Sequence, residues 1–175
     1  MEEQKELLTA RLAAGERAAA EELVDRYYEK IYLYMRRMGH SRQTSEDLTQ
    51  ECFLKAWQHI SQLKYTRALG SWLYSIAGNL SSVYWRRNRN VSSLDCGIDE
   101  PDISRNGLDA AEHTEQLCRL KDAVVKLPVK LRQAVVLHYL QQLTIAESAE
   151  VMSIREGTFK SRLNRALMLL KKTLP

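Results

Sequence analysis

Apolar side chains recur along the chain at intervals of three and four residues, which is the spacing of one face of an α-helix. The strict alternation of apolar and polar residues that is typical of strands is almost absent. The sequence therefore predicts an all-α fold. The expected helices cover about 3–12, 18–38, 44–60, 67–87, 111–126, 128–140, 144–151 and 155–172.

Turn and capping residues predict where these helices begin and end. Gly15 and Gly39 follow the first two apolar patterns and favour helix ends. Thr44 is expected to cap the third helix, because its hydroxyl can accept from a free backbone N–H. Pro128 suits the first turn of a later helix, where its missing N–H is not needed. The predicted inner stripe of the second helix is Leu23, Tyr27, Ile31 and Met35.

A segment of different composition separates the helical patterns. Residues 91–110 contain Pro101, two glycines and many polar side chains, so we expect a flexible acidic linker between small helical domains at 1–90 and 111–175. The segment 95–115 carries seven acidic residues and one basic residue, whereas 155–172 carries six basic residues and one acidic residue. A basic helix face is a footprint of nucleic-acid binding, although many such faces are merely solvated.

The composition also disfavours several classes of protein. No apolar run reaches the roughly 18 residues that cross a bilayer, and the start MEEQKELL lacks a signal-peptide core, so we expect a cytoplasmic protein. The three cysteines, Cys52, Cys96 and Cys118, are far apart, which fits reduced thiols. The four histidines show no metal-ligand spacing, and no phosphate loop or hydrolase motif occurs. We therefore expect no cofactor, no metal and no enzyme active site.

The stretch DLTQECFLKAW, residues 47–57, is predicted to form an amphipathic helix with one exception. Leu54 falls among the acids and amides of the face that should meet water. It is either a contact for a partner protein or a lone exposed leucine, which is common in soluble proteins. The apolar face comprises Leu48, Cys52, Phe53, Ala56, Trp57 and Ile60, and the polar face comprises Asp47, Gln50, Glu51 and Gln58.

The last two predicted helices have the outline of a helix-turn-helix. Ala149 is small where the two helices must cross, and Ile154 anchors the turn. Ser153 stands at a turn position that needs glycine if φ is positive there, at a cost of about 1 kcal/mol. The alternative is a helical hairpin with a solvated basic face. The expected apolar stripe is Phe159, Leu163, Ala166, Leu167 and Leu170, and the opposite face offers Lys160, Ser161, Asn164 and Arg165 to a major groove, with Thr158 placed to hold a phosphate.

A second candidate nucleic-acid surface lies at the end of the first domain. Aromatic side chains interleaved with arginine suit unstacked bases and phosphates, although several of these aromatics keep the spacing of a helix core. Asn79 is a polar residue in an apolar neighbourhood, which is compatible with an ordinary surface amide. The residues concerned are Tyr65, Trp72, Tyr74, Tyr84 and Trp85, followed by Arg86, Arg87 and Arg89.

Four motifs in this order resemble bacterial sigma factors of the sigma-70 family, in its small two-domain extracytoplasmic-function branch. They are DLTQECFLKAW, SWLYSIAGNL with its trailing arginines, LPVKLRQAVVLHYLQQLT and GTFKSRLNRA. The resemblance covers nearly the whole chain. Three residues depart from the family pattern: Leu69, where phenylalanine is usual, Ser148, where an apolar residue is usual, and Ser153, where the turn glycine is usual.

The resemblance implies a transcription factor without catalysis of its own. Its first domain, sigma region 2, would bind core RNA polymerase and open the −10 promoter element, and its second, region 4, would read the −35 element. An anti-sigma factor is the implied regulator. The implied contacts are Asp47, Gln50, Glu51 and Leu54 for polymerase; Asn79, Arg86 and Arg87 for −10 DNA; and Thr158, Lys160, Ser161, Asn164 and Arg165 for −35 DNA.

Two other classes of function remain as alternatives. A free-standing helix-turn-helix regulator, with a sensing or dimerising first domain, would bind duplex DNA tightly without polymerase. An enzyme acting on nucleic acid is the second alternative, but no carboxylate cluster or metal set supports it.

Overall fold

A computed structural model describes residues 2–60, 63, 69–88 and 109–173, with the side chains of 2–6 and 109–116 excepted. The described residues form helices and no strand, which confirms the all-α prediction. The predicted linker at 91–110 lies almost entirely outside the described residues, as do Tyr65, Arg89 and Cys96. The elements are α1 (Glu2–Ala13), α2 (Arg17–Arg37), α3 (Arg42–His59), α4 (Leu69–Arg87), α5 (Asp109–Lys126), α6 (Val129–Val135), η3 (Val136–Leu140), α7 (Ile145–Val151) and α8 (Glu156–Thr173).

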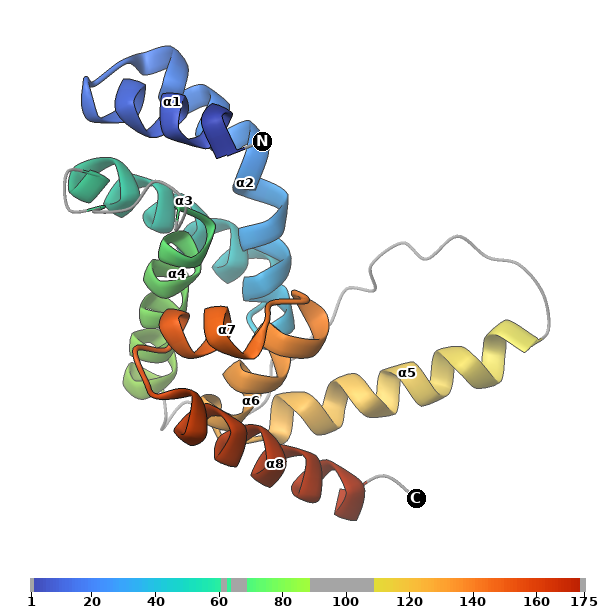
Figure 1. Cartoon of the computed structure of the whole chain (residues 1–175). Helices are drawn as coiled ribbons and strands as arrows, with labels where there is room; N and C mark the ends of the chain where they lie inside the picture. Colours follow the sequence, from blue (N-terminus) through green and yellow to red (C-terminus); the bar gives the residue numbers. More distant parts are fainter. Residues whose placement is uncertain (1, 61–62, 64–68, 89–108, 174–175) are drawn as a thin grey trace.

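Helices α2, α3 and α4 pack around one core in the first half of the chain (Figure 1). The predicted inner stripe of α2 is fully confirmed, because all four of its side chains are buried. Cys52 of α3 is completely buried, as expected for a small core residue, and Leu73 and Ala77 of α4 lie in the same core. These three helices therefore fix the positions of the predicted polymerase and −10 residues.

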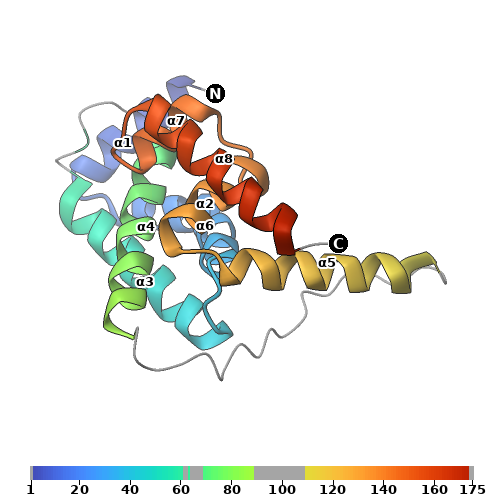
Figure 2. The same ribbon diagram turned by 90° about the horizontal axis from the view of Figure 1, so that it is seen from below.

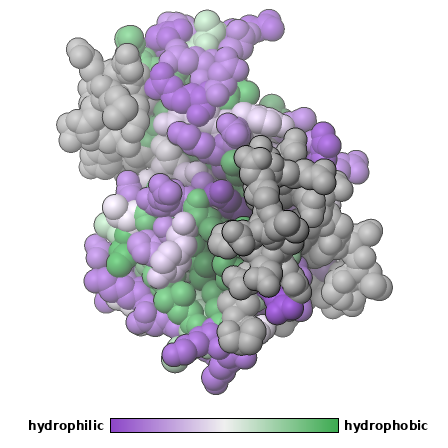
Figure 3. All heavy atoms as spheres, turned by 90° about the vertical axis from the view of Figure 1, so that its right-hand side faces the viewer, coloured by the Kyte–Doolittle hydropathy of each residue, from purple (hydrophilic) through white to green (hydrophobic). Residues whose placement is uncertain are grey.

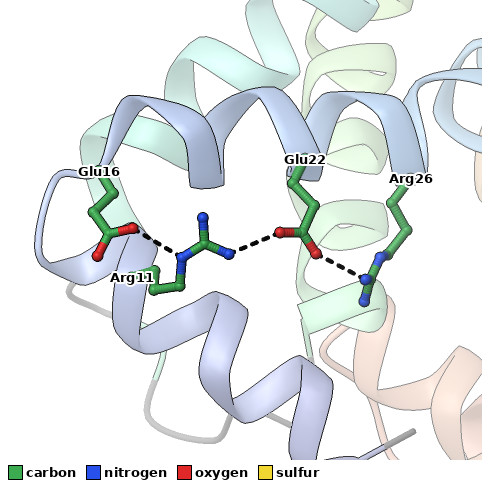
Figure 4. A network of polar contacts seen from close by, with 4 residues as sticks. All are labelled: Arg11, Glu16, Glu22 and Arg26. Atoms are coloured by element: carbon green, nitrogen blue, oxygen red, sulfur yellow. Dashed lines mark hydrogen bonds and ion pairs between the residues drawn. The ribbon is translucent and has the colours of Figure 1, made fainter.

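Helix α1 folds back on α2 through a hairpin at Gly15, whose φ of 77° favours glycine. Its buried Leu8 and Leu12 face the core. Figure 4 shows the ion pairs at this junction: the Arg11 guanidinium lies 2.8 Å from Glu16 and 2.9 Å from Glu22, and Glu22 also binds Arg26 at 2.9 Å. Half-exposed pairs of this kind contribute little singly. The buried leucines are thus the main attachment of α1.

The start of α3 differs from the prediction. Ser41, and not Thr44, is the N-cap, because its extended backbone turns its hydroxyl toward the first free amides and it accepts from Thr44 N–H at 3.2 Å. Thr44 is the third residue of the helix. Both are hydroxyl residues near the expected boundary, and the sequence alone did not distinguish them.

The second half of the chain contains α5 to α8. Pro128 caps α6, which continues into η3, where Gln141 N–H donates to the Val136 carbonyl at 2.9 Å. The predicted helix to Leu140 is thus present, but its last turn is wider than an α-helix. Helix α5 projects from the body at its N-terminal end, and α8 packs against it (Figures 1 and 2).

The two halves of the chain are packed against each other. Helix α7 lies on α4, and η3 lies on α2 (Figure 1). Polar side chains also cross between the halves, including Arg132 of α6, which is only 6% exposed. The sequence analysis predicted two domains and did not predict this contact.

The turn between α7 and α8 contains strained backbone at Ser153, where φ is 52°. Only glycine adopts this conformation freely, so we expect Ser153→Gly to raise the free energy of unfolding by up to about 1 kcal/mol. Thermal denaturation followed by circular dichroism measures the shift. The exposed Ser161, which has helical backbone in α8, is the matched control, and Ser161→Gly should instead destabilise the protein. A lower melting temperature for Ser153→Gly would contradict this interpretation.

Candidate polymerase and promoter interfaces

The polar face of α3 is exposed as predicted. Asp47, Gln50 and Glu51 are all exposed, and Leu54 is 62% exposed among them. The buried face of the same helix holds Leu48, Phe53 and Ala56 in the core. Leu54 therefore contributes nothing to the core, and the structure leaves it free to contact a partner.

A shallow apolar groove of about 410 Å³ begins beside Leu54 and runs between α2 and α3. Sequence reasoning placed Trp57 on the buried face, but its side chain is 38% exposed and lines this groove. The α2 side was not predicted: Val24 and Tyr28, four residues apart, line the groove beside the inner stripe. The full lining is Ala20, Leu23, Val24, Tyr28, Gln50, Phe53, Leu54 and Trp57.

A second groove, of about 520 Å³, lies between α3 and α4. Asn79 lines it and is exposed, and Arg87 lines it near the end of α4. Trp72, half-buried, supplies an aromatic wall. Such a groove offers a planar surface for a base, an amide that can donate and accept hydrogen bonds, and a cation for phosphate. Arg86 is exposed but is not part of the lining.

Helix α3 separates the two grooves. Gln50 and Leu54 line the apolar groove, whereas Glu51 and its partner Lys55, 3.0 Å away, line the second one. Glu51 was predicted to contact polymerase, and it borders the predicted −10 surface as well. The two candidate interfaces are therefore adjacent rather than on opposite sides of the first domain.

The aromatic side chains of α4 do not all face a nucleic-acid surface. Tyr74 is 6% exposed, packs edge-on against Tyr34, and burial raises the pKa of its hydroxyl to about 12. Trp85 stacks on His40 beneath Arg132. Tyr74 is thus unavailable for base stacking in this arrangement, because its ring is buried in the core, whereas Trp85 is half-buried. Trp72 and Tyr84 remain at the groove.

Helices α7 and α8 form the predicted helix-turn-helix. Thr144 caps α7 and accepts from Glu147 N–H at 3.2 Å, while the Glu147 carboxylate accepts from Thr144 N–H at 2.8 Å, which is a complete capping box. Ala149 is buried where the helices approach. In the turn, Ile154 N–H donates to the Ala149 carbonyl at 3.0 Å. The geometry of α8 relative to α7 is therefore set by backbone hydrogen bonds and close packing.

The two faces of α8 differ as the sequence predicted, with one exception. Leu167 was placed on the apolar stripe but is 37% exposed. Thr158, near the start of the helix, is exposed. The buried stripe is Phe159, Leu163, Ala166 and Leu170, and the opposite, exposed face is Lys160, Ser161, Asn164 and Arg165.

The second half of the chain also exposes large apolar side chains, two of them on α8 itself. Figure 3 shows hydrophobic surface between hydrophilic borders on the side that faces right in Figure 1. The most exposed large apolar residues of this half are Leu120, Tyr139, Leu140, Leu167 and Met168.

Metal and membrane sites are not evident in the part of the chain that the structure describes. No group of three or more His, Cys, Asp or Glu residues there is placed to hold a metal ion. None of the described helices is both long enough and apolar enough to cross a membrane.

The chain matches two family models: Sigma-70 region 2 over residues 23–91 and Sigma-70, region 4 over residues 119–170. It is 34% identical to the ECF RNA polymerase sigma factor BldN of Streptomyces coelicolor over 171 residues, which span 96% of this chain and 65% of BldN. It is 31% identical to the ECF RNA polymerase sigma factor SigW of Bacillus subtilis over 170 residues, 91% of each chain.

Solved structures show the same fold. The structure of CnrH in complex with the cytosolic domain of CnrY matches with a TM-score of 0.71 and 23% identity, over 95% of this chain and 94% of that one. RpoE of Bartonella quintana, in complex with the anti-sigma factor NepR, matches with a TM-score of 0.69 and 21% identity, over 87% of this chain and 94% of that one.

These matches define a transcription initiation factor of the sigma-70 family. The chain belongs to the extracytoplasmic-function (ECF) class of RNA polymerase sigma factors. The predicted resemblance is thereby confirmed, and so is the expectation that the protein acts with RNA polymerase and promoter DNA.

Proposed function

We propose that the chain directs core RNA polymerase to promoters through three surfaces, of which the first two adjoin at Glu51. The polar face of α3, with Asp47, Gln50, Glu51 and Leu54, binds polymerase. The groove between α3 and α4 engages the −10 element, and the exposed face of α8 reads the −35 element. In this proposal residues 1–90 act as sigma region 2, 91–110 as the linker and 111–175 as region 4.

The observation that carries the proposal is the exposed leucine of α3. An apolar side chain that is 62% exposed and ringed by polar groups has the anatomy of an interface core with a polar rim. The adjoining apolar groove, which includes Trp57, extends this surface. Tryptophan and tyrosine in such positions often supply much of the binding energy of an interface.

The −10 groove suits capture of a single base. A flipped base loses a few kcal/mol of stacking and pairing, which a fitted pocket restores through stacking and hydrogen bonds. Asn79 supplies a donor and an acceptor, and Trp72 supplies a stacking surface. Arg87 in the groove and Arg86 beside it supply positive charge for the DNA backbone.

The −35 contacts follow from the exposed face of α8. Lys160 and Arg165 can donate to guanine O6 and N7, and Asn164 can pair with adenine. Ser161 already donates to the Gly157 carbonyl at 2.9 Å, so its hydroxyl oxygen remains available as an acceptor. Thr158 lies near the helix N-terminus, where a phosphate is favoured.

An anti-sigma factor is the proposed regulator, and a cytoplasmic location follows from the partners. The Bartonella quintana neighbour was solved with an anti-sigma factor. A regulator of this kind competes most directly with polymerase if it covers the apolar groove between α2 and α3. A competition assay between core polymerase and a co-purified inhibitor tests this directly.

Replacing Arg165 by alanine is expected to lower affinity for a mapped promoter about ten-fold or more, because a base contact of this kind is worth about 1–3 kcal/mol. Binding of wild-type and variant holoenzyme to promoters with intact and altered −35 elements measures the effect. The variant should no longer distinguish the two promoters at the contacted position, while its affinity for core polymerase is unchanged.

Lys171→Ala is the matched control for charge, because Lys171 is exposed on α8 but lies beyond the reading positions. It should weaken DNA binding slightly and leave selectivity intact. Equal promoter selectivity in Arg165→Ala and wild type would contradict the assignment. Tight duplex binding by the chain without polymerase would favour the free-standing regulator.

A further inference from the structure

The short segment between η3 and α7 contains strained backbone. Residues 141–143 join the two helices, and Gln142 in the middle has a φ of 58°. Glycine adopts this left-handed conformation freely, whereas a residue with a side chain adopts it at a cost in free energy. The Gln142 side chain is exposed, so its own packing does not offset this cost. Other contacts must therefore hold the segment in place.

The backbone of Leu143, the last residue of this segment, is bonded to η3 through both of its polar groups. Its N–H donates to the Leu137 carbonyl at 3.1 Å, and its carbonyl oxygen lies 2.9 Å from Nδ1 of the His138 ring. Because a carbonyl oxygen can only accept, Nδ1 of His138 carries a hydrogen and donates it. Two neighbouring residues of η3 thus fix Leu143, one through its backbone and the other through its side chain.

The residue that follows this segment begins the helix-turn-helix. Thr144 is the N-cap of α7, and its capping box with Glu147 fixes the first turn of that helix. The hydrogen bond from Ile154 to Ala149 then sets the turn between α7 and α8. The position of Leu143 therefore determines where α7 starts and, through α7, where the reading face of α8 lies.

The His138 ring also contacts α8 directly. It lies edge-on to the Phe159 ring, with 6.4 Å between the ring centroids and an angle of 78° between the planes. Phe159 is completely buried in the first turn of α8, between Thr158 and Lys160 of the exposed face. One half-buried side chain of η3 is thus in contact with both the segment that leads into α7 and the start of α8.

We propose that His138 is a positioning residue for recognition of the −35 element. Its Nδ1–H holds the strained segment 141–143 against η3, and its ring rests on Phe159, so that α7 and α8 keep the orientation in which the exposed face of α8 fits the major groove. Without the hydrogen bond the segment relaxes and this orientation loses population. The inference rests on the proposed function of α8, but the hold on the segment can be measured without DNA.

Substitutions at His138 separate the hydrogen bond from the ring contact. Asparagine carries an N–H group bonded to Cγ, as Nδ1 is in histidine, so His138→Asn keeps the donor and removes the ring. His138→Phe keeps a ring and removes the donor. Val135→Ala is the control for a general loss of stability, because Val135 is a buried residue of α6 with neither a donor nor a ring.

Holoenzyme with His138→Phe should bind a promoter with an intact −35 element up to about ten-fold more weakly than wild type, because one neutral hydrogen bond shifts a conformational equilibrium by about that factor. Its affinity for the same promoter with an altered −35 element should not change, since that complex does not use the reading face. His138→Asn should retain most of the wild-type selectivity. Val135→Ala should lower the melting temperature but keep the selectivity when binding is measured well below that temperature.

The strain at Gln142 supplies a second test. Gln142→Gly removes the cost of the positive φ, so the segment depends less on the hydrogen bond from His138. In the double variant His138→Phe with Gln142→Gly, a large part of the lost selectivity should return. If His138 acted by packing alone, a change at the exposed Gln142 would restore nothing.

Hydrogen exchange of backbone amides measures the hold on the segment in the absence of DNA. The amide of Leu143 donates to η3, and those of Glu147 and Ser148 donate to Thr144 at the start of α7. These three amides should exchange faster in His138→Phe than in wild type, while His138→Asn should remain close to wild type.

Equal exchange rates and equal promoter selectivity in His138→Phe and wild type would overturn the proposal. A loss of selectivity in His138→Asn as large as that in His138→Phe would overturn it as well. A failure of the proposed function looks different: faster exchange in His138→Phe, in a chain whose holoenzyme shows no −35 selectivity at all, supports the hold on the segment and rejects the assignment of α8 as the reading helix.

Discussion

Replacing Phe159 by alanine is expected to lower the free energy of unfolding of the helix-turn-helix by about 3–5 kcal/mol. The side chain is completely buried at the start of α8, and its ring packs edge-on against His138. The substitution removes the largest of the four buried side chains that hold α8 in place and leaves a cavity behind. Loss of −35 binding should follow.

The three tryptophans make this effect measurable domain by domain. Trp57, Trp72 and Trp85 all lie in the first half of the chain, but Trp85 also contacts Arg132 of α6, so the experiment uses a Trp85→Phe background in which fluorescence reports on the first half. In Phe159→Ala, circular dichroism should show a helical transition at lower temperature than the main tryptophan transition. Met168→Ala, at a residue of α8 that is 61% exposed, is the control and should change stability by less than about 0.5 kcal/mol. Coincident transitions at the wild-type temperature in Phe159→Ala would contradict this account.

Replacing Leu54 by aspartate is expected to weaken binding to core RNA polymerase by about 30-fold or more. A central apolar interface residue contributes about 2 kcal/mol or more, and a buried, unpaired carboxylate adds a further penalty. The fold should be unaffected, because the side chain is 62% exposed. Fluorescence anisotropy of labelled protein titrated with core polymerase measures the affinity.

Leu7 provides a close control for this experiment. It is also 62% exposed, but it lies on α1, outside the polymerase face of α3. Leu7→Asp adds the same charge to the same domain, so any general electrostatic effect appears in both variants. Equal losses of affinity in the two variants, or no loss in Leu54→Asp, would reject the placement of the polymerase interface.

Helical periodicity predicted the elements and most of their buried faces. The buried stripe of α2 and the two faces of α8 could be predicted from the spacing of apolar residues alone, because both helices are amphipathic. The predictions that Trp57 and Leu167 are buried were wrong, because a helical wheel gives the direction of a side chain but not the depth of its burial. Each lies at the margin of its apolar face.

Residue types near helix ends were also not enough to predict every cap and turn. The cap of α3 was assigned to Thr44. Ser41 can also accept from a backbone amide, and it is the cap because its backbone is extended. The wide turn of η3 and the positive φ of 58° at Gln142 could not be predicted from the residue types at these positions. By contrast, the sequence identified Ser153 as a position where a positive φ would be costly, because glycine is usual there, and its φ is 52°.

The contact between the domains was outside the reach of sequence patterns. Arg132 and Gln133 stand in the apolar run between Leu131 and Ala134, and both are buried. That polar pair is the one signal that could have been used. Its partners are a backbone carbonyl at Met38 and the space above Gly78. Both are features of the folded first domain, so they cannot be inferred from the sequence pattern.

The most direct test of the central claim is transcription in vitro. Purified chain is mixed with core RNA polymerase and fragmented genomic DNA, and the 5′ ends of the RNA products are mapped. The account predicts new start sites that share −35 and −10 elements, and loss of these starts in Leu54→Asp but not in Leu7→Asp. The absence of any new start site, with or without binding to core polymerase, would contradict it.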